Sequence, residues 1–220
     1  MTAPLPRLVI LISGTGSNMA TLIDAVKRGA VGADVAAVFS NRPDARGLIT
    51  AREAGIATEV LDHRQFPDRE SFDRALAQRI DVHNPDLVVL AGFMRILTPG
   101  FVRHYRGRLI NIHPSLLPKY PGLNTHQRAI DAGDDEAGAT VHFVTEELDG
   151  GPAIVQARVP ILPGDSADSL ANRVLAMEHR IYPEAVQLFC SGRLRMDNQG
   201  VTLDGRLLPP SGVLFNENTG

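Results

Sequence analysis

Short apolar runs alternate along this chain with segments in which apolar residues recur at helical spacing. Leu8–Ile12 is the first apolar run, and Leu87–Ala91 is another that contains no polar residue. Runs of this kind are typical of parallel strands that are covered on both faces. Strands alternating with helices predict an α/β fold, in which a Rossmann-like, mostly parallel, twisted sheet carries helices on both faces.

The same patterns predict the other elements. Strands are expected at five further apolar runs, Val35–Phe39, Ala57–Leu61, Leu109–Ile112, Thr140–Val144 and Ile154–Val159. Helices are expected over Ala45–Ala54, Thr125–Ala132 and Ser166–Tyr182, and after the capping residues Asn18 and Asp68. Pro183 is expected to break or restart the last helix, because proline lacks the amide hydrogen. Arg193–Met196 and Val201–Leu208 predict a C-terminal β-hairpin, and Pro209 to Gly220 is expected to be loose.

The composition indicates one ordinary soluble globular domain over residues 1–220, with 44% hydrophobic and 21% charged residues. A net charge of −3 provides no basic field, so no nucleic-acid partner is expected. No apolar run is long enough for a signal peptide or a membrane span, so no membrane attachment is expected. Cys190 is the single cysteine, which excludes an internal disulfide and fits a reducing, cytoplasmic location. Its apolar helical surroundings predict a buried, inert thiol.

A glycine-containing loop, Ser13 to Asn18, joins the first expected strand to the first helix. Its glycines let the backbone approach an anion, and the free amides at a helix start bind phosphate. The alternative is a tight strand–helix turn without a ligand. A dinucleotide fingerprint is incomplete, because Met19 replaces the third glycine and residues 39–41 end the second strand without an acidic residue for a ribose. The loop therefore predicts a phosphate site and not a nicotinamide site.

Asn111 and His113 are two residues apart at the end of the expected strand Leu109–Ile112. On an extended strand they point to the same side, so an amide donor lies beside an imidazole that takes up a proton near neutral pH. The pair suits a reaction with a tetrahedral, oxygen-charged intermediate, and its nucleophile would come from a substrate. An isolated histidine is more often structural, but a strand end in an α/β fold and the extended backbone imposed by Pro114 favour a site.

Asp149 precedes Gly150-Gly151 at another expected turn. A carboxylate beside His113 would favour the imidazolium and orient the ring. The alternative is a plain turn aspartate, because Asp-Gly is a common turn pair. The spacing alone does not show whether Asp149 meets His113.

The run Phe93–Leu97 follows an expected strand and either lines a pocket for a flat heterocycle or packs in the core. The histidines show no paired ligand spacing and there is no cysteine cluster, so no metal is expected. The sequence has no Gly-x-Ser-x-Gly elbow, so a serine hydrolase is a poor fit.

Six motifs occur in order between about Arg7 and about Pro210: SGTGSN, VFSN, VVLAGFMRIL, NIHPSLLPKYPG, VHFVTEELDGGP and MEHRIYP. Together they resemble the phosphoribosylglycinamide formyltransferases, the folate-dependent glycinamide ribonucleotide transformylases of purine synthesis. The resemblance implies a three-layer formyltransferase fold. It also implies transfer of a formyl group from the co-substrate 10-formyltetrahydrofolate to the amine of 5-phosphoribosylglycinamide.

The resemblance further implies roles for individual residues. Asn111 would hold the formyl oxygen, His113 would stabilise the intermediate and assist proton transfer, and Asp149 would raise the basicity of His113. The ribonucleotide would be bound by Gly16, Ser17 and Asn18 at its phosphate and by Glu178 at its glycinamide part. The folate would be bound by Arg69, Met94, Arg95, Ile96, Leu97, Asn111, Thr145, Glu146, Glu147, Leu148 and Asp149. The N-terminal half would thus bind the phosphate and the C-terminal half would bind folate and hold the catalytic residues, in a monomer or homodimer without a metal.

Three alternatives stand beside this interpretation. Methionyl-tRNA formyltransferase normally carries an added C-terminal domain, and formyltetrahydrofolate hydrolase carries an N-terminal regulatory domain. Neither is expected here, because the chain ends soon after its core and its first strand begins at about Leu8. A catalytically silent nucleotide-binding module would have lost a site residue, whereas Asn111, His113 and Asp149 are all present.

Overall fold

The computed structural model describes residues 4–215. Within it the chain forms two compact units, Met1–Asn111 and Ile112–Gly220, which are considered in turn. The single formyltransferase domain expected over residues 1–220 stays a prediction.

The first unit is built on parallel strands. In chain order they are β1 (Arg7–Ile12), β2 (Asp34–Ser40), β3 (Thr58–Val60), β4 (Leu87–Leu90) and β5 (Leu109–His113), the last two residues of which belong to the second unit. Their order in space is β3-β2-β1-β4-β5. Every residue of β1 from Leu8 to Ile12 is fully buried, as a strand covered on both faces requires. The predicted α/β class with a mostly parallel sheet is confirmed.

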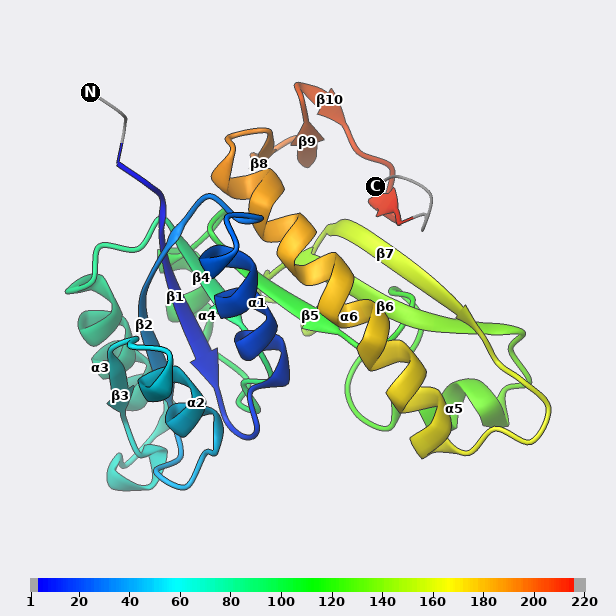
Figure 1. Cartoon of the computed structure of the whole chain (residues 1–220), viewed down its shortest axis with the longest axis horizontal. Helices are drawn as coiled ribbons and strands as arrows, with labels where there is room; N and C mark the ends of the chain where they lie inside the picture. The colour runs from blue at the N-terminus through cyan, green and yellow to red at the C-terminus, as the bar shows by residue number, and fades with distance from the viewer. Residues whose placement is uncertain (1–3, 216–220) are drawn as a thin grey trace. The chain divides into compact units, whose positions relative to one another are not determined.

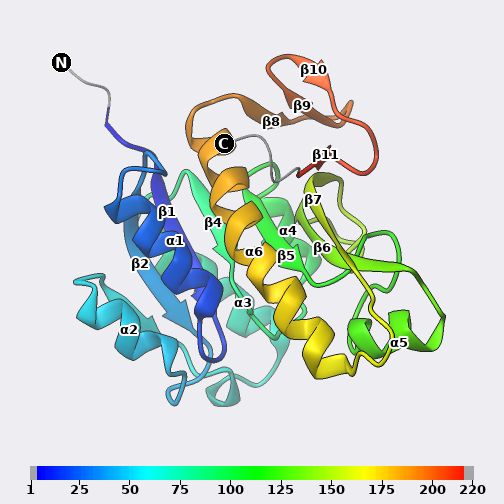
Figure 2. The ribbon, with the colours of Figure 1, turned by 45° about the vertical axis from the view of Figure 1, so that its right-hand side comes forward.

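Helices cover both faces of these strands. They are α1 (Ser17–Lys27), α2 (Gly47–Glu53), α3 (Arg69–Asp81) and α4 (Pro99–His104), with a 3-10 turn, η1 (His63–Gln65), before α3. Helices α1 and α2 pack against each other on one face, and α3 and α4 pack against each other on the other (Figures 1 and 2). Right-handed crossovers explain this division, because the chain moves outward from β1 to β3 and then returns to place β4 on the other side of β1.

This reversal creates a switch point between β1 and β4. In open α/β sheets ligands bind outside the carboxyl ends of the strands at such a point. The loops after β1, β2 and β4 therefore meet where the first unit is expected to hold a ligand.

The second unit contains antiparallel strands and one long helix. Its elements are α5 (Thr125–Asp131), β6 (Glu136–Phe143), β7 (Ala153–Pro160), α6 (Ala167–Cys190), β8 (Leu194–Met196), β9 (Val201–Leu203), β10 (Arg206–Leu207) and β11 (Val213–Leu214). Strands β6 and β7 are antiparallel, and α6 lies along both of them (Figure 1). Its inward side buries Leu170, Val174 and Ile181 completely. Strands β8, β9 and β10 form a small separate sheet.

Two helix predictions were wrong. Asn18 does not cap α1, because Gly16 occupies the cap position with a left-handed backbone and the helix begins at Ser17. Pro183 does not break the last helix, since α6 continues to Cys190. Fully buried side chains on both sides of Pro183, among them Tyr182 and Ala185, explain why packing on β6 and β7 outweighs the missing hydrogen bond.

Four smaller expectations also need correction. The predicted hairpin has a third strand, because Asp204 and Gly205 adopt positive φ and turn Val201–Leu208 into β9 and β10. Part of the expected loose segment is β11, which pairs with β7 in parallel, while residues 216–220 lie outside the described residues. Helix α4 was not predicted, although Thr98 caps it and Pro99 begins it, because six residues show little periodicity. Cys190 is half-buried at the end of α6 and not fully buried.

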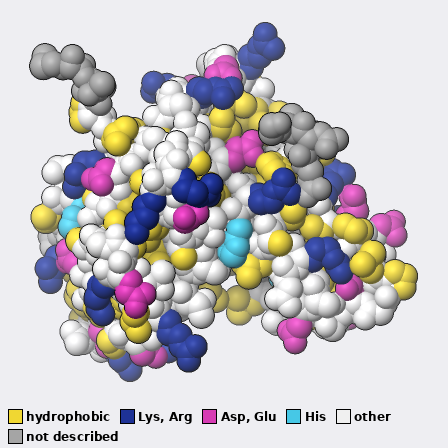
Figure 3. Space-filling view, in the orientation of Figure 1, with side chains coloured by type: hydrophobic (Ala, Val, Ile, Leu, Met, Phe, Trp, Pro, Cys, Tyr) yellow, Lys and Arg dark blue, Asp and Glu magenta, His cyan; other side chains and the backbone are white. Residues whose placement is uncertain are grey.

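The surface carries mixed charge. On the face drawn in Figure 3, basic and acidic side chains lie interspersed and hydrophobic ones form small groups. Among residues 4–215, no helix has both the length and the apolar character needed to cross a bilayer.

Candidate active site

The loop after β1 has the geometry of an anion-binding turn. Gly16 has a φ of 71°, and a Cβ there would approach both the Cα of Gly47 and the Cε of Met19 to 3.2 Å. The turn therefore requires glycine for its backbone angle and for its close contacts. Helix α1 begins directly at Ser17, and backbone amides at the start of a helix are groups that can bind an anion.

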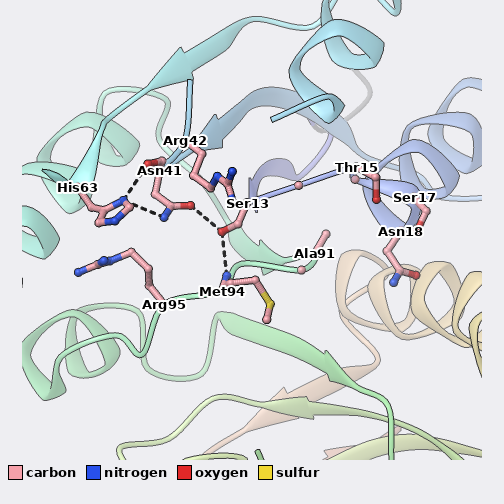
Figure 4. A pocket seen from close by; sticks show the side chains of 13 residues that line it. Ser13, Thr15, Ser17, Asn18, Asn41, Arg42, His63, Ala91, Met94 and Arg95 are labelled. Carbon is pink, nitrogen blue, oxygen red and sulfur yellow. Dashed lines mark hydrogen bonds between the residues drawn. The ribbon is translucent and has the colours of Figure 1, made fainter. Parts of the chain in front are cut away.

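A cavity of about 460 Å³ opens in front of this loop. Its walls come from the segments after β1, β2 and β4 and from η1, and Figure 4 shows their side chains. The predicted phosphate residues Gly16, Ser17 and Asn18 all line it. Asn41, Arg42 and His63 also line it but were not among the predicted site residues. Asn41 ends the VFSN motif, which was noted without a role for this residue, whereas Arg42 and His63 offered only their positions at strand and turn ends.

The segment after β4 exposes apolar side chains beside the same cavity. Met94 is 70% exposed and Ile96 is 59% exposed, whereas Phe93 and Leu97 are buried. The alternative that the whole run packs in the core is therefore wrong for Met94 and Ile96. Exposed apolar side chains at a strand exit suit contact with a flat ligand.

Polar contacts hold the rest of this segment. The Cζ of Arg95 lies 5.0 Å from the centre of the Phe72 ring, a cation–π contact. The backbone amide of Thr98 donates to the Asp73 carboxylate at 2.6 Å. Burial raises the pKa of Asp73, while the nearby charges of Arg95 and Arg69 oppose that shift. Arg69, at the start of α3, and Arg95 thus lie near one carboxylate of the first unit.

In the second unit His113 and Asp149 come together. The Nδ1 of His113 lies 3.5 Å from the Oδ2 of Asp149, and the two side chains are 8% and 9% exposed. The Nε2 of His113 lies 2.9 Å from the carbonyl oxygen of Tyr120. Because a carbonyl only accepts, Nε2 carries a hydrogen, and Nδ1 is the ring nitrogen that faces the carboxylate.

A tight turn presents Asp149 to the histidine. Asp149 has a φ of 51°, and its Oδ2 accepts a hydrogen bond from the Gly122 amide at 2.9 Å. A Cβ on Gly151 would overlap the carbonyl oxygen of Phe143, so the turn needs glycine at that position. Asp149 is therefore both a turn residue and the neighbour of His113.

A second histidine faces the same carboxylate. His142 is buried, and its Nε2 lies 3.9 Å from the Oδ1 of Asp149. Burial lowers the pKa of His142 to about 4, and its Nδ1 donates to the Phe143 carbonyl at 3.0 Å. His142 is thus neutral near pH 7 and leaves the charge of Asp149 to act on His113.

The remaining predicted residues lie on recognisable elements. Asn111 is half-buried on β5, two residues before His113. Glu146, Glu147 and Leu148 are exposed in the turn before Asp149, with Thr145 half-buried at its start. Glu178 is 7% exposed on α6, and its charge adds to the burial that raises the pKa of Tyr182. Within residues 4–215 no group of three or more His, Cys, Asp or Glu side chains is arranged to hold a metal ion.

Comparisons with known proteins identify the family of this chain. The formyl transferase family matches residues 6–186. The chain belongs to this family.

Relatives within the family narrow the class. The chain is 56% identical to phosphoribosylglycinamide formyltransferase of Escherichia coli (strain K12) over 96% of its length and 100% of that protein. It is 51% identical to the trifunctional purine biosynthetic protein adenosine-3 of Drosophila melanogaster in an alignment that covers 84% of this chain and 14% of that protein. The solved phosphoribosylglycinamide formyltransferase of Coxiella burnetii superposes with a TM-score of 0.93 at 51% identity, over 97% of this chain and 100% of that one. The predicted formyltransferase fold is confirmed.

Proposed function

We propose that Asn111, His113 and Asp149 carry the catalytic step of this formyltransferase. The enzyme transfers the formyl group of 10-formyltetrahydrofolate to the amine of 5-phosphoribosylglycinamide in purine biosynthesis, giving 5-phosphoribosyl-N-formylglycinamide and tetrahydrofolate. The observation that carries the assignment of residues is the buried 3.5 Å contact between His113 and Asp149.

The chemistry requires no nucleophile from the protein. The substrate amine attacks the formyl carbon and generates a tetrahedral intermediate with a negatively charged oxygen. The Asn111 amide donates a hydrogen bond to that oxygen, a contact that strengthens as the charge develops. His113 in its imidazolium form stabilises the same charge and donates its proton to the folate nitrogen as the bond between that nitrogen and the formyl carbon breaks. The neutral imidazole then takes up the proton that the substrate amine loses, and the Asp149 carboxylate favours the imidazolium form. Positioning two bound reactants contributes about 7–11 kcal/mol and one oxyanion donor about 2.7–4 kcal/mol, so substrate binding is the larger contribution.

The two substrates are assigned to the predicted binding residues. Gly16, Ser17 and Asn18 bind the ribonucleotide phosphate through the amides that begin α1, and Glu178 contacts the glycinamide part. The exposed apolar side chains of Met94 and Ile96 support the assignment of folate contacts to them and to Arg69 and Arg95 in the first unit. The Thr145–Asp149 turn is assigned folate contacts in the second unit. In this proposal the N-terminal half supplies the phosphate site and part of the folate contacts, and the C-terminal half supplies the catalytic residues and the other folate contacts.

Location and assembly are also proposed. A single cysteine fits a reducing cytoplasm, and no helix among the described residues could span a membrane. The enzyme acts there as a monomer or a homodimer.

A formyl-transfer assay tests these assignments. Purified enzyme is mixed with 10-formyltetrahydrofolate, with and without 5-phosphoribosylglycinamide, and tetrahydrofolate release is followed. Release that depends on the ribonucleotide is expected for the wild-type enzyme. Loss of this release in His113→Ala assigns the catalytic step to His113. Release with water alone would indicate a hydrolase, and no release at all would indicate a silent module.

A further inference from the structure

Ser13 connects the two substrate-binding segments of the first unit. Its hydroxyl donates to the Oδ1 of Asn41 at 2.6 Å and accepts a hydrogen bond from the backbone amide of Met94 at 2.8 Å. Figure 4 shows both contacts in the wall of the cavity. Because a hydroxyl has one hydrogen and that hydrogen goes to Asn41, the three groups form a chain with a single direction, from Met94 through Ser13 to Asn41.

Asn41 is fixed at its other end as well. With Oδ1 taken by Ser13, its Nδ2 faces the Nδ1 of His63 at 3.2 Å, and the same ring nitrogen lies 3.0 Å from the Asn41 carbonyl oxygen. Ser13 and Asn41 are each only 4% exposed. In a dinucleotide-binding fold the end of the second strand presents an acidic side chain outward to a ribose. Here the side chain at that position, Asn41, is buried and accepts a hydrogen bond from the Ser13 hydroxyl.

The Ser13 amide also donates to the carbonyl of Gly92 at 3.0 Å, directly before the folate segment (Phe93–Leu97), so the Ser13 hydroxyl adds a second contact to that backbone bond. Met94 itself is 70% exposed, so packing of its own side chain does not place it. The far end of the segment is held separately, where the Thr98 amide donates to Asp73 at 2.6 Å. Ser13 therefore holds the near end, three residues before Gly16 of the phosphate loop.

We propose that Ser13 and Asn41 are positioning residues that couple the phosphate loop to the folate segment. They touch neither reacting atom; they hold the loop and the Met94 amide in one arrangement, so that loss of either side chain loosens both binding segments together. This inference rests on the proposed assignment of the two segments to the two substrates.

Steady-state kinetics of Ser13→Ala, Asn41→Ala and the double variant test the proposal. We expect KM for the ribonucleotide and KM for 10-formyltetrahydrofolate to rise together by about tenfold, as loss of one buried hydrogen bond produces, with kcat changed less than about threefold. Because either substitution breaks the same chain, the double variant should match the single ones and not multiply their effects. Ser13→Thr keeps the hydroxyl and should restore both KM values.

Ser40→Ala is the matched control. Ser40 is 1% exposed, and its hydroxyl bonds only the backbone of Arg42 in its own turn, at 2.9 and 3.0 Å. Both KM values should stay within about twofold of wild type for this variant. If only one KM rises in the Ser13 or Asn41 variants, if neither rises, or if the effects multiply, the coupling role is wrong. Absence of formyl transfer by the wild-type enzyme would instead overturn the proposed function. Should Ser13→Ala fail to fold, Asn41→Ala carries the same test.

Discussion

The Nδ1 of His113 lies 3.5 Å from the Oδ2 of Asp149, and both side chains are less than one tenth exposed. The opposite ring nitrogen is committed to the Tyr120 carbonyl at 2.9 Å. The ring nitrogen that faces Asp149 therefore lies next to a carboxylate that water barely reaches. Under the proposed mechanism this contact gives Asp149 a role of its own, which its replacement tests.

Replacing Asp149 with asparagine should lower kcat by about 10²–10⁴, the range over which a general acid–base group contributes. The amide keeps the shape but has no charge to favour the imidazolium. Turnover is measured with saturating substrates across a range of pH. Asp165→Asn is the control, because Asp165 is similarly buried, at 7%, and pairs with Arg173 on α6. It should lower stability without changing kcat, and equal losses in both variants would contradict the role of Asp149.

Asn111→Ala should lower kcat by about 10²–10³, as the loss of an oxyanion donor does. KM for both substrates should change much less, because the lost hydrogen bond forms mainly in the transition state. A single-turnover measurement separates the chemical step from binding. Near-normal turnover would remove Asn111 from the mechanism.

The phosphate site predicts strong discrimination against a substrate without its phosphate. Glycinamide riboside should bind about 10²–10⁴ less tightly, because two hydrogen bonds to a charged group contribute roughly 3–6 kcal/mol. Calorimetry with the two ligands measures the difference. Equal affinities would mean that Gly16, Ser17 and Asn18 do not hold the phosphate.

Two glycines with similar backbone angles allow the loss of ribonucleotide binding to be distinguished from the loss of stability that backbone strain causes. Gly16 and Gly29 have nearly the same φ, 71° and 73°, at opposite ends of α1. A Cβ on Gly29 meets nothing within 4 Å. Both alanine variants should therefore lose stability, but only Gly16→Ala should raise KM for the ribonucleotide. Similar KM values for the ribonucleotide in both variants would contradict the proposed phosphate site at Gly16.

His142 should make the enzyme less stable in mild acid. The pKa of His142 is about 4 in the folded state, whereas an ordinary histidine has a pKa of 6.5, so between these pH values the unfolded chain binds the extra proton. Stability present above pH 6.5 is lost as the pH falls, by about 2 kcal/mol between pH 7 and pH 5. Urea unfolding of wild type and His142→Gln at both pH values checks this. If His142→Gln loses as much free energy of unfolding between pH 7 and pH 5 as the wild type does, this role of His142 is wrong.

Much of the first unit was predictable because its signals are local. Leu87–Ala91 contains only residues that suit a doubly covered strand, and Asp68 does cap α3 by accepting from the Ser71 amide at 2.7 Å. The glycine loop before α1 carries its own backbone requirement. Such features depend on neighbours a few residues away, so a single sequence records them.

The contact between His113 and Asp149 was not predictable from the residues alone. The two residues are far apart in the sequence. They meet because Asp149 lies in a turn with a φ of 51° and because its carboxylate accepts a hydrogen bond from the Gly122 amide. The same limit applies to Asn41, which accepts a hydrogen bond from Ser13 of another strand end, and to Ser13, which accepts one from the Met94 amide of a third. Distant contacts of this kind are set by strand order, which local patterns do not encode.

Pro183 offers a test of what holds α6 in place. Its ring removes the hydrogen bond to the His179 carbonyl, which costs about 3 kcal/mol relative to alanine in a helix interior. Pro183→Ala restores that bond. It also loses roughly 1 kcal/mol of half-buried ring packing and up to about 1 kcal/mol from a more flexible unfolded chain. A net gain of about 1 kcal/mol follows, with Tm raised by about 2–4 °C in calorimetry.

Pro163→Ala is the control, because Pro163 is exposed in the connection between β7 and α6 and should lose stability when replaced. The kinetics of Pro183→Ala separate two accounts of Glu178, which lies on α6 five residues before the proline. If packing on β6 and β7 sets the position of Glu178, KM for the ribonucleotide stays unchanged while Tm rises. If the proline sets it, KM rises together with Tm, and packing is not what positions this side chain.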